Sequence, residues 1–391
     1  MIRDDASERQ VRAADPDAST WLSANAGSGK TRVLTDRVAR LLLGANSPDS
    51  AGTEPHRILC LTYTKAAASE MQNRLFRRLG AWAMMGADVL RDQLRGLGVE
   101  GHIDDSTLSR ARRLFARAIE TPGGLKIQTI HSFCASLLRR FPLEAGVSPQ
   151  FTEMDGRTGE LLRAEIIEDM ADTRAPGVIA RLASLYTGED FAGLAEEVAK
   201  SGSEFTPPKD RAAIWRTFGL TPETSAAQIL GSVFLGGEAE WIPQVAQILA
   251  AGSANDVKLA EKVGKLALMS PRFHDLAAFE DVFLYGKSKV EGRSFTAKTG
   301  ALGTRATQAR LEPLLDQLEP FMARVEAART TRIALVAAEK THALHEFAAS
   351  FLPEYAKRKA LRGWLDFDDL ILRARDLLTN PSVAQWVLFR L

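Results

Sequence analysis

A glycine-containing loop near the amino terminus holds the residue types that bind nucleotide phosphates. The segment ANAGSGKT covers residues 24–31 and ends in Gly29, Lys30 and Thr31. Glycines let backbone amides face phosphate oxygens, a lysine reaches the β and γ phosphates, and a threonine hydroxyl ligates magnesium. The pattern departs from the usual phosphate loop at Ala24, where a glycine is common. The loop therefore predicts a site for ATP and Mg²⁺, with Thr31 as the metal ligand.

The elements on both sides of the loop support this prediction. The apolar composition of TWLSA, residues 20–24, predicts a strand, and the apolar stripe in residues 33–42 predicts an amphipathic helix that ends at Gly44. A helix that begins at the loop also directs its positive end at a bound phosphate. Lys30 and Thr31 are the predicted catalytic residues. The predicted nucleotide contacts in this region are Ala24, Asn25, Ala26, Gly27, Ser28, Gly29, Lys30, Thr31 and Arg32.

Two further segments place polar and aromatic side chains at predicted strand ends. RILCLT, which has the composition of a strand buried on both faces of a parallel sheet, precedes Tyr63 and Thr64. LKIQT, the next predicted strand, ends in Thr129 and is followed by His131 and Phe133. Ligands collect at the carboxyl ends of strands in open α/β sheets. These residue types suit single-stranded nucleic acid, whose bases stack on aromatic rings, and ordinary packing of the two aromatic residues is the alternative.

The charge of the chain is unevenly distributed. The whole chain carries +1, but residues 1–150 hold 21 Lys and Arg against 16 Asp and Glu, an excess of five. Residues 151–391 hold 29 against 33, a deficit of four. Arginine clusters in the first part can neutralise nucleic-acid phosphates, and solvated helix faces explain them equally well.

The composition also argues against a membrane or disulfide-rich protein. No apolar run reaches the length that a membrane span requires, and the start MIRDDASERQ has no signal-peptide character. The two cysteines, Cys60 and Cys134, are too few for a disulfide framework and lie in apolar runs, so we expect both in the core. We expect a cytoplasmic protein with no membrane partner.

Secondary-structure patterns divide the chain into three stretches, which suits a length above that of an ordinary single domain. Residues 1–150 alternate predicted strands and helices, apart from a helical excursion at about 80–124. Residues 151–362 are mainly helical, and residues 363–391 contain one more helical pattern.

Two local features stand out in the later stretches. Residues 313–362 predict one or two long helices, with a kink or break at Pro353, because proline lacks the amide that an inner helical turn needs. Asp366 precedes the last helical pattern and is predicted to cap it.

The order of the motifs resembles one known family. The phosphate loop, LTYTKAAASEM and TIHSFC resemble motifs I, Ia and Ib of superfamily 1 helicases of the UvrD and RecB type. ANAGSGKT together with HSFCASLLRRFPLEAG resembles the helicase-nuclease subunits of bacterial double-strand-break repair complexes. The motif resemblance covers residues 7–150, and LDFDDLIL resembles the stretch ahead of motif II.

The resemblance implies a fold and an activity. The implied fold is α/β, a P-loop NTPase with a RecA-like parallel sheet and a large, mainly helical inserted domain. Residues 1–150 would form motor domain 1A, residues 151–362 the inserted domain 1B, and residues 363–391 the return toward domain 1A. The implied activity is an ATP-dependent DNA helicase that acts on single-stranded and double-stranded DNA beside a partner subunit of the AddB type.

The resemblance also assigns roles to individual residues. Gln10, in ASERQ, corresponds to the family's adenine-reading glutamine ahead of the phosphate loop. Tyr63 corresponds to an aromatic residue that stacks on a DNA base. Thr64, Thr129 and His131 correspond to positions along the single-strand track.

The sequence contains no recognisable pair of hydrolytic carboxylates. Hydrolysis needs one carboxylate to hold magnesium and another to orient water, usually as Asp-Glu at the end of an apolar strand. We expect an amino-terminal fragment that ends before motif II and shows negligible DNA-stimulated ATP hydrolysis by itself. The acidic candidates downstream do not end an apolar strand and are predicted to be solvated or capping residues: Asp155, Glu280, Asp281, Asp366, Asp368 and Asp369.

Two other functions are compatible with the sequence. A non-helicase P-loop ATPase or kinase would use the helical region as a lid or substrate domain, and it would have no affinity for single-stranded DNA. A non-catalytic module would dock a partner through the helical region, and it would not bind ATP.

Overall fold

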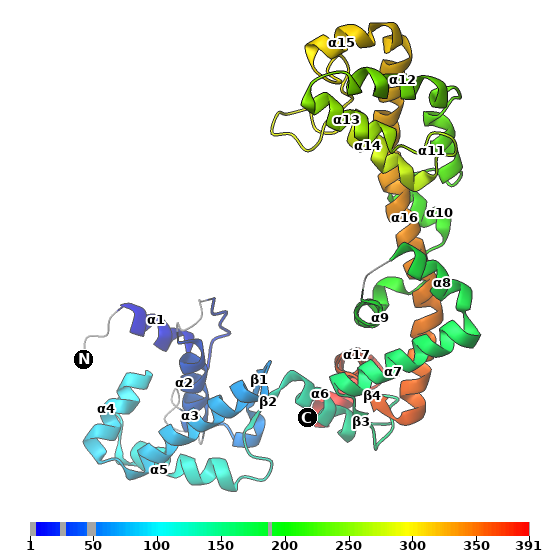
Figure 1. The fold of residues 1–391 in the computed structure, drawn as a ribbon. Coiled ribbons are helices and arrows are strands. Elements are labelled where there is room, and N and C mark those ends of the chain that lie inside the picture. The colour runs from blue at the N-terminus through cyan, green and yellow to red at the C-terminus, as the bar shows by residue number, and fades with distance from the viewer. Residues whose placement is uncertain (1–4, 24–28, 45–51, 187–189, 391) are drawn as a thin grey trace. The chain divides into compact units, whose positions relative to one another are not determined.

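A computed structural model describes residues 5–23, 29–44, 52–186 and 190–390. The chain divides into two compact units, which are described separately (Figure 1). Unit 1 comprises Met1–Met154 and Gly363–Leu391, and unit 2 comprises Asp155–Arg362.

Unit 1 joins helices to two short pairs of parallel strands. Its elements are α1 (Asp5–Ala13), α2 (Lys30–Leu43), η1 (Pro55–Arg57), β1 (Leu59–Thr62), α3 (Lys65–Met84), α4 (Ala87–Leu97), α5 (Asp105–Glu120), β2 (Lys126–Thr129), α6 (Ile130–Arg140), β3 (Thr152–Glu153), β4 (Trp364–Leu365), α17 (Phe367–Thr379) and α18 (Ala384–Arg390).

The predicted strands RILCLT and LKIQT are confirmed as the parallel pair β1 and β2. Their register sets Leu59 opposite Lys126 and Thr62 opposite Thr129, so both strands end at the same edge. The prediction that RILCLT is buried on both faces is wrong for the described structure, because Leu59 and Leu61 are 42% and 41% exposed while Cys60 is buried. No helix covers the outer face of β1 among the residues that the structure describes, so alternate side chains stay in solvent.

The predicted strand in TWLSA is also wrong for its described part. Thr20 to Ser23 pair with no strand, and the Trp21 side chain is 93% exposed. A strand forms only where a neighbouring backbone satisfies its amides and carbonyls, so apolar composition alone does not produce one. Among the described residues, the predicted parallel sheet is present only as the pairs β1–β2 and β3–β4. Its full extent remains a prediction.

The helix predicted after the phosphate loop is confirmed as α2. Gly29 precedes it with φ 88°, a left-handed conformation that side chains disfavour, and Gly44 ends it with φ 70°. Val38, Leu42 and other residues of the apolar stripe face the core that α3, α4 and α5 complete. The helical excursion predicted at about 80–124 is therefore confirmed as part of this core.

A second core of unit 1 brings together α6 and α17. Leu138 and Leu370 are fully buried in it, together with Cys134. Asp366 caps α17 by accepting a hydrogen bond from the Asp369 amide at 2.8 Å, and Asp369 accepts from the Asp366 amide at 3.1 Å, which confirms the predicted cap. Cys60 and Cys134 are both buried and free, as predicted.

Unit 2 is mainly helical in its described residues, with one isolated antiparallel bridge between Leu284 and Ala297. Its elements are α7 (Gly156–Asp169), the π-helical turn η2 (Met170–Arg174), α8 (Pro176–Leu185), α9 (Phe191–Lys200), η3 (Gly202–Phe205), α10 (Arg211–Thr217), α11 (Ala226–Val233), α12 (Glu238–Ala250), α13 (Ala254–Gly264), η4 (Phe273–Asp275), α14 (Leu276–Phe283), α15 (Arg305–Leu311), η5 (Glu312–Leu314) and α16 (Leu315–Arg362). Figure 1 shows α16 running the length of the unit, and α7, α8, α10, α11 and α14 pack along it.

A break at Pro353, one of the two predicted outcomes there, is wrong, because α16 continues through it as one helix of 48 residues. Aromatic contacts along one side of the helix span this position. The rings of Phe347 and Phe351 stack at 5.1 Å between centroids, and those of Phe351 and Tyr355 at 5.5 Å. Such packing holds a helix together across the hydrogen bond that proline removes.

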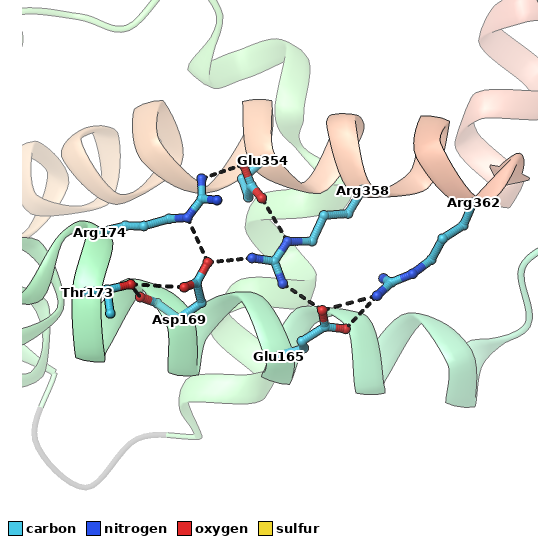
Figure 2. A network of polar contacts seen from close by, with 7 residues as sticks. All are labelled: Glu165, Asp169, Thr173, Arg174, Glu354, Arg358 and Arg362. Atoms are coloured by element: carbon cyan, nitrogen blue, oxygen red, sulfur yellow. Dashed lines mark hydrogen bonds and ion pairs between the residues drawn. The ribbon is translucent and has the colours of Figure 1, made fainter.

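A network of ion pairs joins α16 to α7 (Figure 2). Arg358 contacts Glu165 at 2.7 Å, Asp169 at 2.5 Å and Glu354 at 2.8 Å. Arg174 bridges Asp169 and Glu354 from the other side, at 2.7 and 2.8 Å. Because each of these two arginines meets more than one carboxylate, the network fixes α7 against the last turns of α16.

No helix among the described residues is both long and apolar enough to cross a membrane.

Candidate nucleotide site and strand-end contacts

The described end of the predicted phosphate loop leads directly into α2. Lys30 and Thr31 form the first turn of α2, and both side chains are exposed. Arg32 is exposed as well and lies 3.9 Å from Asp36. The first amides of a helix are not used by the helix itself, so a helix start of this kind can bind an anion. The remaining predicted contacts, Ala24, Asn25, Ala26, Gly27 and Ser28, lie outside the described residues.

Gln10 lies beside this helix start although nineteen positions separate it from Gly29 in the sequence. Its side-chain amide nitrogen is 3.1 Å from the position that a Cβ atom on Gly29 would occupy. A side chain at position 29 would therefore meet Gln10, in addition to the strain of the left-handed φ. The structure brings the predicted adenine-reading glutamine to the predicted phosphate site.

A surface pocket opens next to Lys30. Residues from the end of α1, from the segment after it and from α2 line it, including Ala13, Thr20, Leu22, Val33 and Arg37. Apolar side chains thus line part of the space beside the first turn of α2, which suits the flat face of a base.

The candidate contacts that follow β1 differ in what they offer. Tyr63 is 86% exposed, so its ring is accessible for stacking and the alternative of core packing does not apply to it. Thr64 caps α3, and its hydroxyl oxygen accepts a hydrogen bond from the Ala67 amide at 3.1 Å. Its side chain therefore also has a structural role.

The candidates that follow β2 are less exposed. Thr129 is buried and caps α6, where its hydroxyl oxygen accepts from the Ser132 amide at 3.1 Å. Phe133 is half-buried and packs against the core that α6 and α17 share. His131 is half-buried, with its ring centroid 4.6 Å from that of Phe367. Thr129 is thus the least accessible of the three.

Phe367 is a candidate contact that sequence reasoning missed. Its ring is 50% exposed and lies against His131, although 236 positions separate the two. The sequence does offer one signal for Phe367, which is an aromatic residue directly after the helix cap Asp366. At that position the ring lies away from the buried face of α17. Its partner could not be found from local pattern.

Most described members of the arginine clusters have acidic or backbone partners. Arg74 pairs with Glu70, Arg78 with Asp36, Arg117 with Glu54 and Arg139 with Glu153. These pairs favour the interpretation of structural surface charge over a preformed phosphate-binding surface.

Burial raises the pKa of the Cys60 thiol to about 11, so this residue is not a nucleophile at neutral pH.

The acidic candidates for hydrolysis have structural roles. Asp155 caps α7 by accepting from the Thr158 amide at 2.7 Å, as predicted. The prediction of a solvated residue is wrong for Glu280, which is paired with Arg332 at 2.5 Å and Arg329 at 3.2 Å inside unit 2. Arg329 and Arg332, both from α16, pair with this carboxylate, and its burial is possible because its charge is neutralised. In the described part of the chain, no three His, Cys, Asp or Glu side chains are placed to hold a metal ion.

Comparison with known proteins defines the class of this chain. Residues 5–390 match the model of the UvrD/REP helicase N-terminal domain, so the chain belongs to that family and has its P-loop NTPase fold.

Individual relatives share one name, that of the AddA subunits of ATP-dependent helicase/nucleases. The AddA protein of Pelotomaculum thermopropionicum is 25% identical over 394 residues, which cover 89% of this chain and 27% of that protein. The protein of the same name from Desulforudis audaxviator is 35% identical over 148 residues, 38% of this chain and 10% of that protein. In Desulforamulus reducens the identity is 31% over 183 residues, with 44% and 12% covered. The chain thus spans from 10% to 27% of the length of these relatives.

Proposed function

We propose that this chain binds ATP and Mg²⁺ at the start of α2 and single-stranded DNA at the ends of β1 and β2, as the amino-terminal part of an ATP-dependent DNA helicase. One observation carries the nucleotide site: the Gln10 amide and the first turn of α2 meet at Gly29. The side-chain amide of Gln10 can pair with the edge of a base, and the backbone amides at the start of α2 can bind phosphate. These two groups are close enough for one nucleotide to reach both.

The side chains present fit a magnesium nucleotide. The first turn of α2 offers backbone amides, the Lys30 ammonium supplies a positive charge for phosphate oxygens, and the Thr31 hydroxyl is a ligand of the kind that magnesium accepts. When bound, the metal would neutralise phosphate charge. Lys30 would orient the terminal phosphates, Arg32 would lie beside the nucleotide, and Gln10 would select the base.

The strand-end residues support single-stranded DNA as the second ligand. Tyr63 offers an exposed ring, and His131 with Phe367 forms a second, partly exposed aromatic pair. Bases of any identity stack on such rings, whereas duplex bases are already stacked on one another. Thr64, Thr129 and Phe133 would shape this surface from the helix starts behind it.

The relatives support a larger assembly. We infer that unit 1 corresponds to motor domain 1A with its RecA-like sheet, and unit 2 to the inserted domain 1B. The names of the relatives support a helicase-nuclease of the AddA type that acts on DNA in double-strand-break repair with an AddB-type partner subunit. We infer that the chain by itself turns over little ATP, because the acidic candidates Asp155 and Asp366 are capping residues and Glu280 is ion-paired.

Two titrations test the proposal. The first adds a fluorescent ATP analogue with Mg²⁺, and the second adds a labelled single-stranded oligonucleotide at several salt concentrations. We expect saturable binding of both, with DNA affinity that falls as salt rises, because phosphate contacts release counterions.

The alternatives predict different results. ATP binding without DNA binding would favour a non-helicase P-loop ATPase or kinase. Absence of ATP binding would favour a docking module. Rapid DNA-stimulated hydrolysis that Lys30→Ala abolishes would overturn the proposal that the chain alone is inactive.

A further inference from the structure

The segment that carries Gln10 is held by an arginine of α2. Arg37 donates from Nη1 to the backbone carbonyl of Asp15 at 2.5 Å. From Nη2 it donates to the carbonyls of Ala18 at 2.7 Å and Pro16 at 3.4 Å. The Arg37 guanidinium therefore donates hydrogen bonds to three backbone carbonyls of the segment that connects α1 to the phosphate loop.

A second arginine of α2 holds the same segment closer to Gln10. Arg40 donates from Nη1 to the carbonyl of Val11 at 3.0 Å, and its Nη2 lies 3.6 Å from the Asp15 carboxylate. The Arg40 side chain is buried. Gly98 packs directly against Val11 and Arg40. A Cβ atom added at this glycine would lie 2.4 Å from Val11 and 3.0 Å from Arg40, so only glycine fits there.

The two arginines and Lys30 belong to one rigid element. Arg37 and Arg40 are three residues apart on α2 and therefore lie on the same face, and Lys30 starts the same helix two turns earlier. Val11 directly follows Gln10 in the chain. The hydrogen bonds of these arginines thus fix the position of Gln10 relative to Lys30.

We propose that Arg37 and Arg40 are positioning residues that set the preference of the site for adenine, by holding Gln10 at a fixed distance from the phosphate-binding turn. This inference rests on the proposed nucleotide site. A base-reading amide discriminates only when it is held in place, because a mobile one can adapt to other base edges. In this scheme Arg40 is buried away from the nucleotide, and Arg37, which borders the pocket beside Lys30, acts through its hydrogen bonds to the backbone carbonyls of residues 15, 16 and 18.

The test compares ATP with GTP in the full chain. Binding of fluorescent ATP and GTP analogues is measured for the wild type, Arg37→Ala, Arg37→Lys and Gln10→Ala. We expect Arg37→Ala to lower the ratio of ATP to GTP affinity by roughly tenfold, the factor that one lost hydrogen bond accounts for, while GTP affinity stays within about twofold. Arg37→Lys keeps one donor group and should recover part of the ratio.

Two controls separate positioning from folding. Arg112 also donates to a backbone carbonyl in unit 1, that of Met85 at 3.1 Å, but far along the chain from Gln10, so Arg112→Ala should leave the ratio unchanged. The double variant Gln10→Ala, Arg37→Ala should discriminate no worse than Gln10→Ala alone, because both changes remove the same contact.

The outcomes are distinct. An unchanged ratio in Arg37→Ala, or an equal loss of ATP and GTP affinity, would overturn the positioning role and leave the nucleotide site intact. If Arg37→Ala does not fold, an unchanged ratio in both Arg37→Lys and Arg40→Lys has the same meaning. Absence of ATP binding in the wild type would overturn the proposed function itself, together with this inference.

Discussion

Charged side chains have different partners in two regions of the molecule, the contact of α7 with α16 in unit 2 and the helix α2 in unit 1. At the base of unit 2, arginines and carboxylates pair with one another, and Arg358 alone meets three acidic groups. On α2 of unit 1, Lys30 faces solvent at the helix start, while Arg37 and Arg40 bond to backbone carbonyls of a neighbouring segment. Charges that neutralise each other hold helices together, whereas charges presented at a helix start or bonded to a connection can receive or position a ligand.

The pKa directions in unit 2 agree with a structural role. A hydrogen bond from the Thr173 hydroxyl lowers the pKa of Asp169 below its ordinary value, with the charges of Arg174 and Arg358 acting in the same direction. A hydrogen bond from Arg358 likewise lowers the pKa of Glu354. Both carboxylates are therefore favoured in the charged form in the folded chain.

The largest expected effect separates the two kinds of charge. Lys30→Ala should weaken binding of an ATP analogue by roughly 100-fold, because it removes charge-assisted contacts to phosphate. The same change should leave the thermal unfolding midpoint nearly unaltered, since the side chain is exposed. Fluorescence titration and thermal denaturation measure the two quantities. Equal nucleotide affinity in the variant would mean that this helix start does not bind phosphate.

The second effect concerns the exposed ring after β1. Tyr63→Ala should weaken single-stranded oligonucleotide binding by roughly tenfold, the usual contribution of one stacked base, and Tyr63→Phe should retain most of the affinity. Fluorescence anisotropy at fixed salt measures both. As a control, Met269→Ala removes an equally exposed apolar side chain from unit 2 and should have no effect. Loss of affinity in the control alone would place the DNA surface elsewhere.

The third effect is on stability. Arg358→Ala should destabilise unit 2 by about 1–2 kcal/mol, because three carboxylates lose a shared partner at a site that is only partly exposed to solvent. Arg181, which has one exposed partner in Glu346, provides the control, and its change to alanine should cost less than about 0.5 kcal/mol. Urea unfolding measures both. Similar costs for the two changes would show that the network adds nothing beyond single surface pairs.

The smallest effect is a pH dependence of that difference. The pKa values of Asp169 and Glu354 are lowered on folding from ordinary values of 3.8 and 4.5, so their stabilising contribution is complete above this range and is lost as the pH falls through and below it. The stability gap between wild type and Arg358→Ala should therefore be constant from pH 7 to about pH 5 and close at lower pH. A gap that widens with acid would contradict this assignment of charge.

Local patterns were sufficient for features whose cause lies in adjacent residues. The helix after the phosphate loop, the strands at Leu59–Thr62 and Lys126–Thr129 and the cap at Asp366 follow from spacing, apolar runs and a short polar side chain. The sequence also identified the candidate residues at the strand ends. It could not tell which of them face solvent, because Thr129 is buried by elements remote in the sequence whereas Tyr63 is not.

The errors share one physical origin, which is dependence on a distant partner. Apolar composition predicted a strand around Trp21, but a strand needs a neighbouring backbone. Proline predicted a break at Pro353, but stacked aromatic rings hold α16 together. Glu280 lies next to Asp281 in the otherwise apolar run LAAFEDVF, and the sequence does not reveal that arginines from α16 pair with it. The role of Arg37 could not be predicted from the sequence, because its partners are backbone carbonyls, which every residue has.

The parallel pairing of β3 with β4 has a consequence for the order of folding. Thr152 lies opposite Trp364, yet the whole of unit 2 separates these residues along the chain. Closing so long a loop in an unfolded chain carries a large entropy cost. The contact between Glu165 and Arg362 draws the two ends of unit 2 together once that unit has formed. We therefore expect unit 2 to fold first and the β3–β4 pair afterwards, so that a change which slows the folding of unit 2 would also delay the formation of this pair.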